Sequence, residues 1–220
     1  MLSRVLETEL MDTEDEARDY DAMDHVGVNR AFATDFLAVF PDQPGSVLDV
    51  GTGTALIPIE LAQRTTRLQF VALDAASHMI ALANQNVERA GLQARVFPQL
   101  ANARGVPFPN QHFAAVVSNA IIHHIEDPLP IFREMIRVCR LGGIAFVRDL
   151  LRPDTEAELT HLVNRYAADA NHHQRTMFAD SLRAAFTLAE MQTLVTGLGF
   201  SADSVRVTSD RHWTWTAHVT

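Results

Sequence analysis

Two short motifs at the ends of predicted strands carry residues that could hold a cofactor. Residues 47–55 read VLDVGTGTA, so an apolar strand runs directly into Gly51-Thr52-Gly53 and then into a predicted helix. Glycines permit a tight turn and let a ligand approach the backbone, and a helix N-terminus offers free N–H groups. Asp74 ends the next predicted strand, where its carboxylate can accept hydrogen bonds from a ribose diol. Together the two features indicate a cofactor that contains a nucleoside, without separating NAD from S-adenosylmethionine.

Each motif also has a purely structural interpretation. The glycines could form a simple turn between a strand and a helix. Asp74 could be the N-cap of the next helix. Ser77 is also suited to that position, which makes an N-cap role for Asp74 less necessary.

The motifs lie in a chain whose short β-like runs alternate with helical segments. This alternation predicts an α/β fold with a mainly parallel sheet. We expect helices at residues 54–63, 77–91 and 127–140, the second ending near Gly91. We expect seven strands, the last two paired as a hairpin, at residues 46–50, 68–74, 94–99, 112–119, 144–150, 204–209 and 212–219.

We predict a single domain over residues 1–220, with a core at 45–150. The first 40 residues predict one or two helices outside the sheet. Residues 153–198 form a predicted helical insertion with breaks near Asn171 and Thr187, and residues 204–219 form the final hairpin.

Composition narrows the class of protein. The net charge is −9, with 18 Lys plus Arg against 27 Asp plus Glu, which argues against nucleic-acid and anionic-lipid partners. No apolar stretch is long enough to cross a membrane, and the acidic start does not resemble a secretory signal. Cys139 is the single cysteine, so we expect no disulfide and a reducing cytoplasm, with Cys139 as a buried apolar residue.

Four stretches of the chain resemble one enzyme family. VLDVGTGTALIPIELA and VALDAASHMIALA look like the first two motifs of the class I S-adenosylmethionine-dependent methyltransferases. ANARGVPFPNQHFAAVVSNAIIHHIEDP is similar to the third and fourth motifs, and IFREMIRVCRLGG resembles the helix and glycine turn before the fifth strand. The resemblance covers residues 45–150 and points to the small-molecule subgroup similar to the ubiquinone/menaquinone biosynthesis methyltransferases. It implies a doubly wound, Rossmann-like, mostly parallel seven-stranded sheet with an antiparallel last strand.

The resemblance also implies roles for individual residues. Asp49 would support the cofactor's ammonium group, Asp74 its ribose hydroxyls, and Asn119 would lie near the methionine and the methyl group. Tyr20 and His25 would belong to an N-terminal helical lid, and the insertion at 153–198 would cover the acceptor pocket. The cofactor-binding residues implied in this way are Tyr20, Asp49, Gly51, Thr52, Gly53, Asp74, Ala75, Met79, Asn102, Ala103 and Asn119.

Three positions depart from the family's pattern. Ala55 stands where many members have a third glycine, and Asn102 stands where aspartate is usual. The turn Arg140-Leu141-Gly142-Gly143 lacks the common proline. None of these changes removes the cofactor site.

Methyl transfer is an in-line displacement that depends mainly on bringing two centres together, and a base is needed only when the acceptor keeps its proton until attack. His123, His124 and Asp149 follow predicted strands and are the catalytic candidates. Alternatively, the histidines pack against the cofactor and the next loop, and Asp149 forms an ion pair with Arg148 or Arg152. Asn171-His172-His173 lacks a metal-binding spacing, so we expect no metal site.

The predicted function is S-adenosylmethionine-dependent methylation of a small molecule, with an acceptor that the sequence does not identify. A methyltransferase acting on tRNA or protein and a non-catalytic cofactor-binding protein are the alternatives. An NAD-dependent oxidoreductase is disfavoured by the absence of a Tyr-x-x-x-Lys pair. A homodimer is left open.

Overall fold

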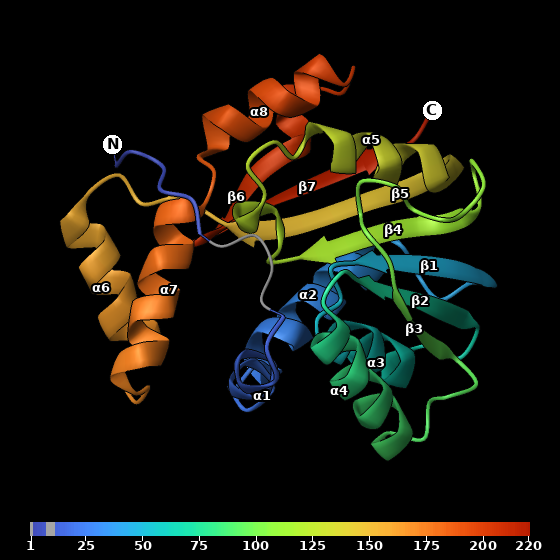
Figure 1. Cartoon of the computed structure of the whole chain (residues 1–220). Helices are drawn as coiled ribbons and strands as arrows, with labels where there is room; N and C mark the ends of the chain where they lie inside the picture. The colour runs from blue at the N-terminus through green and yellow to red at the C-terminus, as the bar shows by residue number, and fades with distance from the viewer. Residues whose placement is uncertain (1, 8–11) are drawn as a thin grey trace. The chain divides into compact units, whose positions relative to one another are not determined.

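Seven strands form the sheet of this protein in a computed structural model that describes residues 2–7 and 12–220. The strands are β1 (Gly45–Val50), β2 (Leu68–Asp74), β3 (Val96–Leu100), β4 (Phe113–Asn119), β5 (Cys139–Leu150), β6 (Val205–Ser209) and β7 (His212–His218). Their order is β3-β2-β1-β4-β5-β7-β6 (Figure 1). β1 pairs in parallel with β2 and β4, and β2 with β3, whereas β6 and β7 pair antiparallel. The predicted α/β class, the mostly parallel sheet and the antiparallel last strand are confirmed.

The chain divides into two compact units. The larger unit comprises Leu10–Asn119, Leu129–Val147 and Ala217–Thr220, and the smaller unit comprises Met1–Glu9, Ala120–Pro128 and Arg148–Thr216. Among the described residues, no helix is long and apolar enough to cross a membrane.

The described part of the larger unit contains five helices. They are α1 (Glu14–Asp21), α2 (Val26–Val39), α3 (Leu56–Arg64), α4 (Ser77–Arg89) and α5 (Leu129–Val138). Figure 1 shows α2, α3 and α4 on one face of the strands and α5 on the other, which is the doubly wound arrangement. α4 ends as predicted, because Gly91 adopts a φ of 68° and its N–H donates to the carbonyl of Glu88.

The core of the larger unit lies between the strands and α2 and α3. Phe32 and Phe36 on α2 are fully buried and meet the Phe146 ring edge-on, at centroid distances of 5.1 and 5.7 Å. Val47 of β1 packs in this core, and Leu48 is buried on the opposite face of the strand, because successive side chains alternate between the two faces. Because β1 is buried on both faces, the residues at its carboxyl end are held in fixed positions.

The smaller unit contains the helical insertion. Its helices are α6 (Glu156–Tyr166), α7 (His172–Ala184) and α8 (Leu188–Gly197), preceded in the chain by the short helix η1 (Ile122–His124). Thr155, Asn171 and Thr187 each form a capping box with the residue three positions later, so the predicted breaks near Asn171 and Thr187 are confirmed.

The fifth strand differs from the prediction. β5 begins at Cys139 rather than at residue 144, and α5 ends at Val138 rather than near Arg140. Gly142, with a φ of 75°, donates to the carbonyl of Val219 at 2.7 Å, so the glycine turn is itself paired into the sheet. A Cβ on Gly143 would lie 2.7 Å from the carbonyl oxygen of Ala114, and glycine permits this close approach. Cys139 is buried as expected, and burial raises the pKa of its thiol to about 11.

Candidate active site

The glycine loop, residues 51–55, connects β1 to α3. Gly51 and Gly53 have φ values of 72° and 54°, in the left-handed region that suits glycine. The N–H groups of Gly51 and Thr52 both donate to the carbonyl of Leu73 at 2.8 Å. The N–H of Gly53 donates to Oδ2 of Asp74, also at 2.8 Å. The end of β2 therefore holds the loop that follows β1.

Ala55 stands at the position of the missing third glycine and still adopts a φ of 63°. This conformation costs an alanine roughly 1–2 kcal/mol relative to ordinary backbone. Ala55 is the N-cap of α3, and its methyl side chain cannot accept a hydrogen bond from the helix start. The N–H groups of the first turn are thus available to an external acceptor, and an anion is the ligand that a helix N-terminus favours.

A narrow cavity of about 20 Å³, enough for roughly one water molecule, lies beside the glycine loop. Its lining comes from α1, α2, β1, the loop, α3 and β4, through Tyr20, Asn29, Asp49, Gly51, Thr52, Thr54, Leu56, Ile57 and Asn119. Five of these nine residues, namely Tyr20, Asp49, Gly51, Thr52 and Asn119, are predicted cofactor residues. Asn29 was missed. It is only 9% exposed, and a polar residue on the buried face of an apolar helix is the signal that could have found it.

Asp49 is the buried charge of this cavity. Its side chain is almost inaccessible, and its Oδ2 atom has no hydrogen-bond partner among the described residues. Burial raises the pKa of Asp49 to about 7, with a smaller lowering by the Thr52 hydroxyl and a further rise from the Asp74 carboxylate. The hydroxyl of Thr54 likewise lacks a partner in the described structure. An unpartnered buried carboxylate is costly, so the site is suited to a ligand that brings a cationic donor.

Tyr20 narrows the cavity. A Cβ on Gly53 would lie 3.4 Å from the Tyr20 ring, so the ring rests close to the glycine loop. The backbone carbonyl of Tyr20 is 2.8 Å from Nε2 of His25, and the two rings are 4.5 Å apart. Burial, with the charges of Asp74, Asp49 and Asp21, raises the pKa of Tyr20 to about 12. Tyr20 therefore stays neutral and offers a phenolic O–H.

The start of α4 corrects one prediction. Ser77 is not the N-cap, because Ala76 holds that position and makes no side-chain cap hydrogen bond. The side chain of Asp12 caps the start of α4 instead. It accepts a hydrogen bond from the N–H of His78 at 3.1 Å and from the Ser77 hydroxyl at 3.2 Å. The helix can begin at Ser77 because an acceptor arrives from a distant segment, which the local sequence does not reveal.

Asp74 itself has two structural contacts. Besides Gly53, it accepts from the N–H of Ala76 at 2.9 Å through Oδ1. Burial raises its pKa, and backbone N–H groups, that of Ala76 first, partly offset the rise. Each carboxylate oxygen has a second lone pair, so these contacts leave capacity for further donors.

The remaining predicted cofactor residues lie away from the cavity lining. Met79 is buried with Ala17 and Ala76, with the Tyr20 ring packed against them. Ala75 and Asn102 are exposed, and Ala103 is partly exposed. The Oδ1 atom of Asn102 accepts from the N–H of Arg104 at 2.8 Å, so the amide oxygen already serves its own loop.

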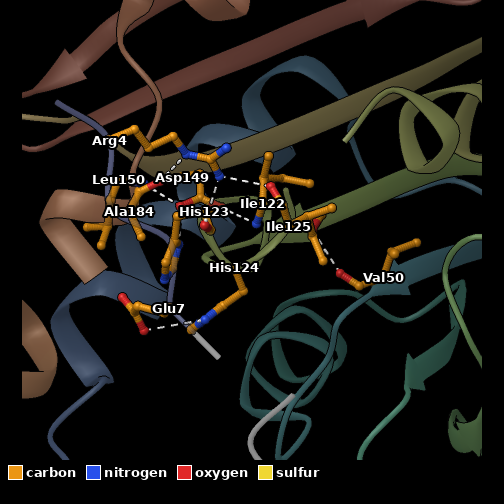
Figure 2. Close-up of polar contacts among 11 residues, drawn as sticks. Arg4, Glu7, Val50, Ile122, His123, His124, Ile125, Asp149, Leu150 and Ala184 are labelled. Carbon is orange, nitrogen blue, oxygen red and sulfur yellow. Dashed lines mark hydrogen bonds and ion pairs between the residues drawn. The ribbon is translucent and has the colours of Figure 1, made fainter. Parts of the chain in front are cut away.

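His123 and Asp149 form a buried pair in the smaller unit. Nδ1 of His123 lies 2.6 Å from Oδ1 of Asp149, and the two side chains are 4% and 1% exposed. Asp149 also accepts from the N–H groups of Ile122, His123 and Leu150 (Figure 2). Burial alone would raise the pKa of Asp149, but His123 and the N–H groups more than offset it and lower the pKa. Burial lowers the pKa of His123, but Asp149 more than offsets this and raises it.

These contacts overturn the alternative in which Asp149 pairs with a neighbouring arginine. Arg148 donates to the hydroxyl of Thr214 at 2.9 Å. Arg152 donates to Glu190 at 2.7 Å and to the carbonyl of Ala185 at 2.9 Å. The sequence favoured neighbours along the strand, whereas the partner of Asp149 comes from η1.

Glu7 brings a carboxylate from the N-terminal segment to the same histidines. Its Oε2 atom is 3.5 Å from Nδ1 of His124, and the two imidazole rings are 4.1 Å apart at their centroids (Figure 2). Burial raises the pKa of Glu7, although His123 and the Ser181 hydroxyl act to lower it.

Arg4 fixes the loop that carries the histidines. Its guanidinium donates to the carbonyls of His123, Ile125 and Glu126 at 3.0, 2.8 and 3.2 Å, and to that of Ala184 at 2.6 Å. It also lies 3.6 Å from the centre of the Phe186 ring. Sequence reasoning missed both Arg4 and Glu7, because nothing near residue 7 signals a partner more than a hundred positions away.

The sheet order, the glycine loop and the two carboxylates at the ends of β1 and β2 define a Rossmann-like protein that binds a nucleoside-containing cofactor. A family model for a methyltransferase domain matches residues 47–143. The ubiquinone/menaquinone biosynthesis C-methyltransferase UbiE of Xanthomonas campestris is 31% identical over 183 residues, which cover 76% of this chain and 72% of the relative.

Two further proteins are similar. The phosphatidylethanolamine N-methyltransferase of Cereibacter sphaeroides is 34% identical over 99 residues, covering 45% of this chain and 47% of the relative. The crystal structure of a SAM-dependent methyltransferase from Aquifex aeolicus has the same fold, with a TM-score of 0.67 at 16% identity and coverage of 94% and 99%. This chain belongs to the class I S-adenosylmethionine-dependent methyltransferases. It is an enzyme, and its cofactor is S-adenosylmethionine.

Residues around the glycine loop of the larger unit match the chemistry of this cofactor. Asp49 offers an unpartnered buried oxygen for an ammonium group, and the uncapped start of α3 suits a carboxylate. The positive φ values of Gly51 and Gly53 keep side chains away from the cavity wall.

Proposed function

We propose that this enzyme transfers the methyl group of S-adenosylmethionine to a small-molecule acceptor. The observation that most supports cofactor binding is the Oδ2 atom of Asp49, which lies beside the glycine loop without a hydrogen-bond partner among the described residues. The acidic balance of the chain supports a small molecule rather than a nucleic acid, because a net charge of −9 repels phosphates. The names of the relatives support it too, since one is a quinone-pathway C-methyltransferase and one a phosphatidylethanolamine N-methyltransferase.

Bound S-adenosylmethionine supplies an electrophilic methyl group on a sulfonium. In this proposal, Asp49 holds the ammonium group, Asp74 holds the ribose hydroxyls, and Asn119 lies near the methionine. Tyr20 covers the cofactor next to the glycine loop, and Gly51 and Gly53 let the cofactor approach the backbone. Thr52, Ala75, Met79, Asn102 and Ala103 remain predicted contacts.

We assign the acceptor side to His123 and His124, with Asp149 as a positioning residue. Asp149 holds the His123 ring through Nδ1 and is itself held by three backbone N–H groups. Such a ring cannot rotate freely, which is what a group that must meet a bound substrate requires.

We also propose that the helical insertion selects the acceptor. A cavity of about 570 Å³ is bounded by residues of α6, α8 and β6. Apolar Leu162 and Val207 share its wall with Arg165 and Asp210. A wall of this mixed character suits a largely apolar molecule with a few polar groups.

The test of the cofactor side is calorimetric titration with S-adenosylmethionine, its demethylated product and NAD. Micromolar binding of the first two without binding of NAD is the expected result. Binding of NAD alone would overturn the proposed function. A steep loss of substrate binding with added salt would instead revive a nucleic-acid acceptor.

The acceptor side is tested by the variant His124→Ala. We expect its affinity for S-adenosylmethionine to stay within about twofold of the wild type, because a change below roughly 0.5 kcal/mol is typical away from a ligand. Turnover of a screened acceptor should fall at least tenfold. Loss of cofactor binding would show that His124 belongs to the cofactor site instead.

A further inference from the structure

Three side chains of the smaller unit converge in a way that the methyltransferase fold does not require. Glu7, His123 and His124 each offer a ligand atom, and the three atoms lie within 4.8 Å of one another. Figure 2 draws the Glu7 carboxylate beside the two imidazoles. His124 and Glu7 are only 16% and 18% exposed, and His123 is 4% exposed.

His123 is oriented by a carboxylate on its far nitrogen. Because Nδ1 lies 2.6 Å from Asp149, Nε2 is the nitrogen through which His123 can bind anything else. Histidines that ligate metals characteristically donate their other ring N–H to a carboxylate or a backbone carbonyl, which fixes the tautomer and raises the basicity of the ligating nitrogen. Asp149 supplies that support, and its own hydrogen bonds to Ile122 and Leu150 hold it in place.

Glu7 has a buried oxygen that the surrounding chain does not satisfy. Its Oε1 atom has no hydrogen-bond partner within residues 2–7 and 12–220. Arg4 is the nearby cation of the same segment, but its guanidinium donates to four backbone carbonyls instead. A buried carboxylate oxygen without a donor is stabilised by a cation bound against it.

We propose that Glu7, His123 and His124 bind one divalent transition-metal ion, with zinc as the best match. Two imidazoles and one carboxylate are a recognised ligand set for catalytic zinc and for non-haem iron, with a coordination position left for water. Magnesium and calcium prefer oxygen ligands alone and fit less well.

The spacing supports zinc. Bonds of about 2.0–2.1 Å in a tetrahedral arrangement place ligand atoms about 3.3 Å apart. The separation of 3.5 Å between His124 and Glu7 is already close to this value. The upper limit of 4.8 Å for the set exceeds this separation by about 1.5 Å, which rotations about the bonds of two side chains can close.

This inference departs from the sequence-based expectation of no metal site, and it goes beyond the proposed function. The sequence draws attention to His172 and His173 because they are adjacent, yet both are exposed at the start of α7. These two histidines provide a matched control that changes the histidine content without touching the proposed ligands.

The experiment is titration of chelator-treated full-length protein with Zn²⁺ by calorimetry and with Co²⁺ by visible absorption. Wild-type protein should bind one equivalent of each ion, and the Co²⁺ spectrum should show a low coordination number. Glu7→Gln and His124→Ala should each bind Zn²⁺ at least tenfold more weakly, whereas the double variant His172→Ala/His173→Ala should match the wild type. Circular dichroism of every variant verifies that it is folded.

The inference is overturned if the wild type shows no saturable binding of either ion. It is also overturned if Glu7→Gln and His124→Ala bind Zn²⁺ as tightly as the wild type does. Both readouts are independent of methyl transfer. Binding of Zn²⁺ without binding of S-adenosylmethionine would therefore overturn the proposed function and support the metal site. Binding of S-adenosylmethionine without binding of Zn²⁺ would overturn the metal site and leave the proposed function standing.

Discussion

Two buried aspartates, one in each unit, have opposite environments. Asp49 in β1 is 1% exposed and Asp149 in β5 is 0% exposed, so both have lost nearly all contact with water. Oδ2 of Asp49 lacks a partner among the described residues, and burial raises its pKa to about 7. Asp149 accepts from three backbone N–H groups and pairs with His123, and its pKa is lowered.

The difference separates a carboxylate that is available for a ligand from one that stabilises the fold. A buried carboxylate with several donors behaves as part of the scaffold, because removing it leaves those donors unsatisfied. A buried carboxylate with an oxygen that lacks a donor destabilises the ligand-free protein and gains most from a bound cation. We therefore expect substitutions of the two residues to change stability in opposite directions.

The largest effect is expected from Asp149→Ala. The variant leaves the backbone N–H groups of Ile122 and Leu150, and the ring of His123, buried without their acceptor. Breaking one member of a buried, hydrogen-bonded pair costs about 3–5 kcal/mol. Urea unfolding measures the change, and Asp154→Ala, at an exposed position, should change stability by less than about 0.5 kcal/mol. A loss below about 1 kcal/mol for Asp149→Ala would contradict its scaffold role.

The next effect is the pH dependence of stability that Asp49 creates. An acid whose pKa is raised on folding contributes stability at low pH, and this contribution is lost as the pH rises through the folded-state pKa. For Asp49 the loss runs from its ordinary value of 3.8 to about 7. At about 1.4 kcal/mol per pKa unit, the loss amounts to as much as about 4 kcal/mol. Asp49→Asn should remove it, so the variant should be the more stable protein at about pH 8 and lose this advantage near pH 4.

Asp42 serves as a control, because its pKa is shifted in the opposite direction to that of Asp49. Hydrogen bonds from the backbone N–H groups of Thr66 and Arg67, the first of these the stronger, lower the pKa of Asp42 at the surface. Asp42→Asn should therefore lose stability relative to the wild type at neutral pH, with the difference shrinking in acid. Parallel unfolding curves for wild type and Asp49→Asn across this pH range would show that Asp49 is satisfied in solution.

The third effect concerns cofactor affinity. Asp74→Ala should weaken binding of S-adenosylmethionine by roughly 1.5–3 kcal/mol, the scale of hydrogen bonds to a charged group, which is about 10- to 150-fold in Kd. Calorimetric titration measures this loss. Because Asp74 also supports Gly53 and Ala76, the unfolding free energy of the same variant must be measured beside it. Unchanged affinity would remove Asp74 from the cofactor site.

The glycine loop and the histidine cluster also differ in what the sequence could predict. The residues of the loop and its supports, from Asp49 to Asp74, lie within one βαβ unit, so their spacing alone predicts the turn and the helix that follows. The strand pattern also predicts both ends of β2 correctly, at Leu68 and Asp74. Its apolar run follows the polar residues 63–67 and ends before the predicted start of the next helix. Local patterns determine these features, and a sequence displays local patterns directly.

The cluster depends on contacts between distant segments. Glu7, His123 and Asp149 come from three separate parts of the chain, and no periodicity connects them. The same limit explains the error at Ser77, where Asp12 supplies the acceptor from outside the helix. It also explains the start of β5, which depends on pairing with Val219 near the end of the chain.

The smallest effect is expected at the glycine loop itself, from Gly53→Ala. The new Cβ would lie 3.4 Å from the Tyr20 ring, an ordinary contact, so the cost comes mainly from the φ of 54° and should be about 1 kcal/mol in stability. Gly27→Ala is the matched control, because this helical glycine of α2 has no described atom within 4 Å of an added Cβ. It should stabilise the protein by roughly 0.5–1 kcal/mol. Thermal unfolding of the two variants then distinguishes backbone strain from loss of chain flexibility. Equal shifts in the same direction would mean that the left-handed conformation at Gly53 imposes no constraint, and the loop would lose its role in letting the cofactor meet the backbone.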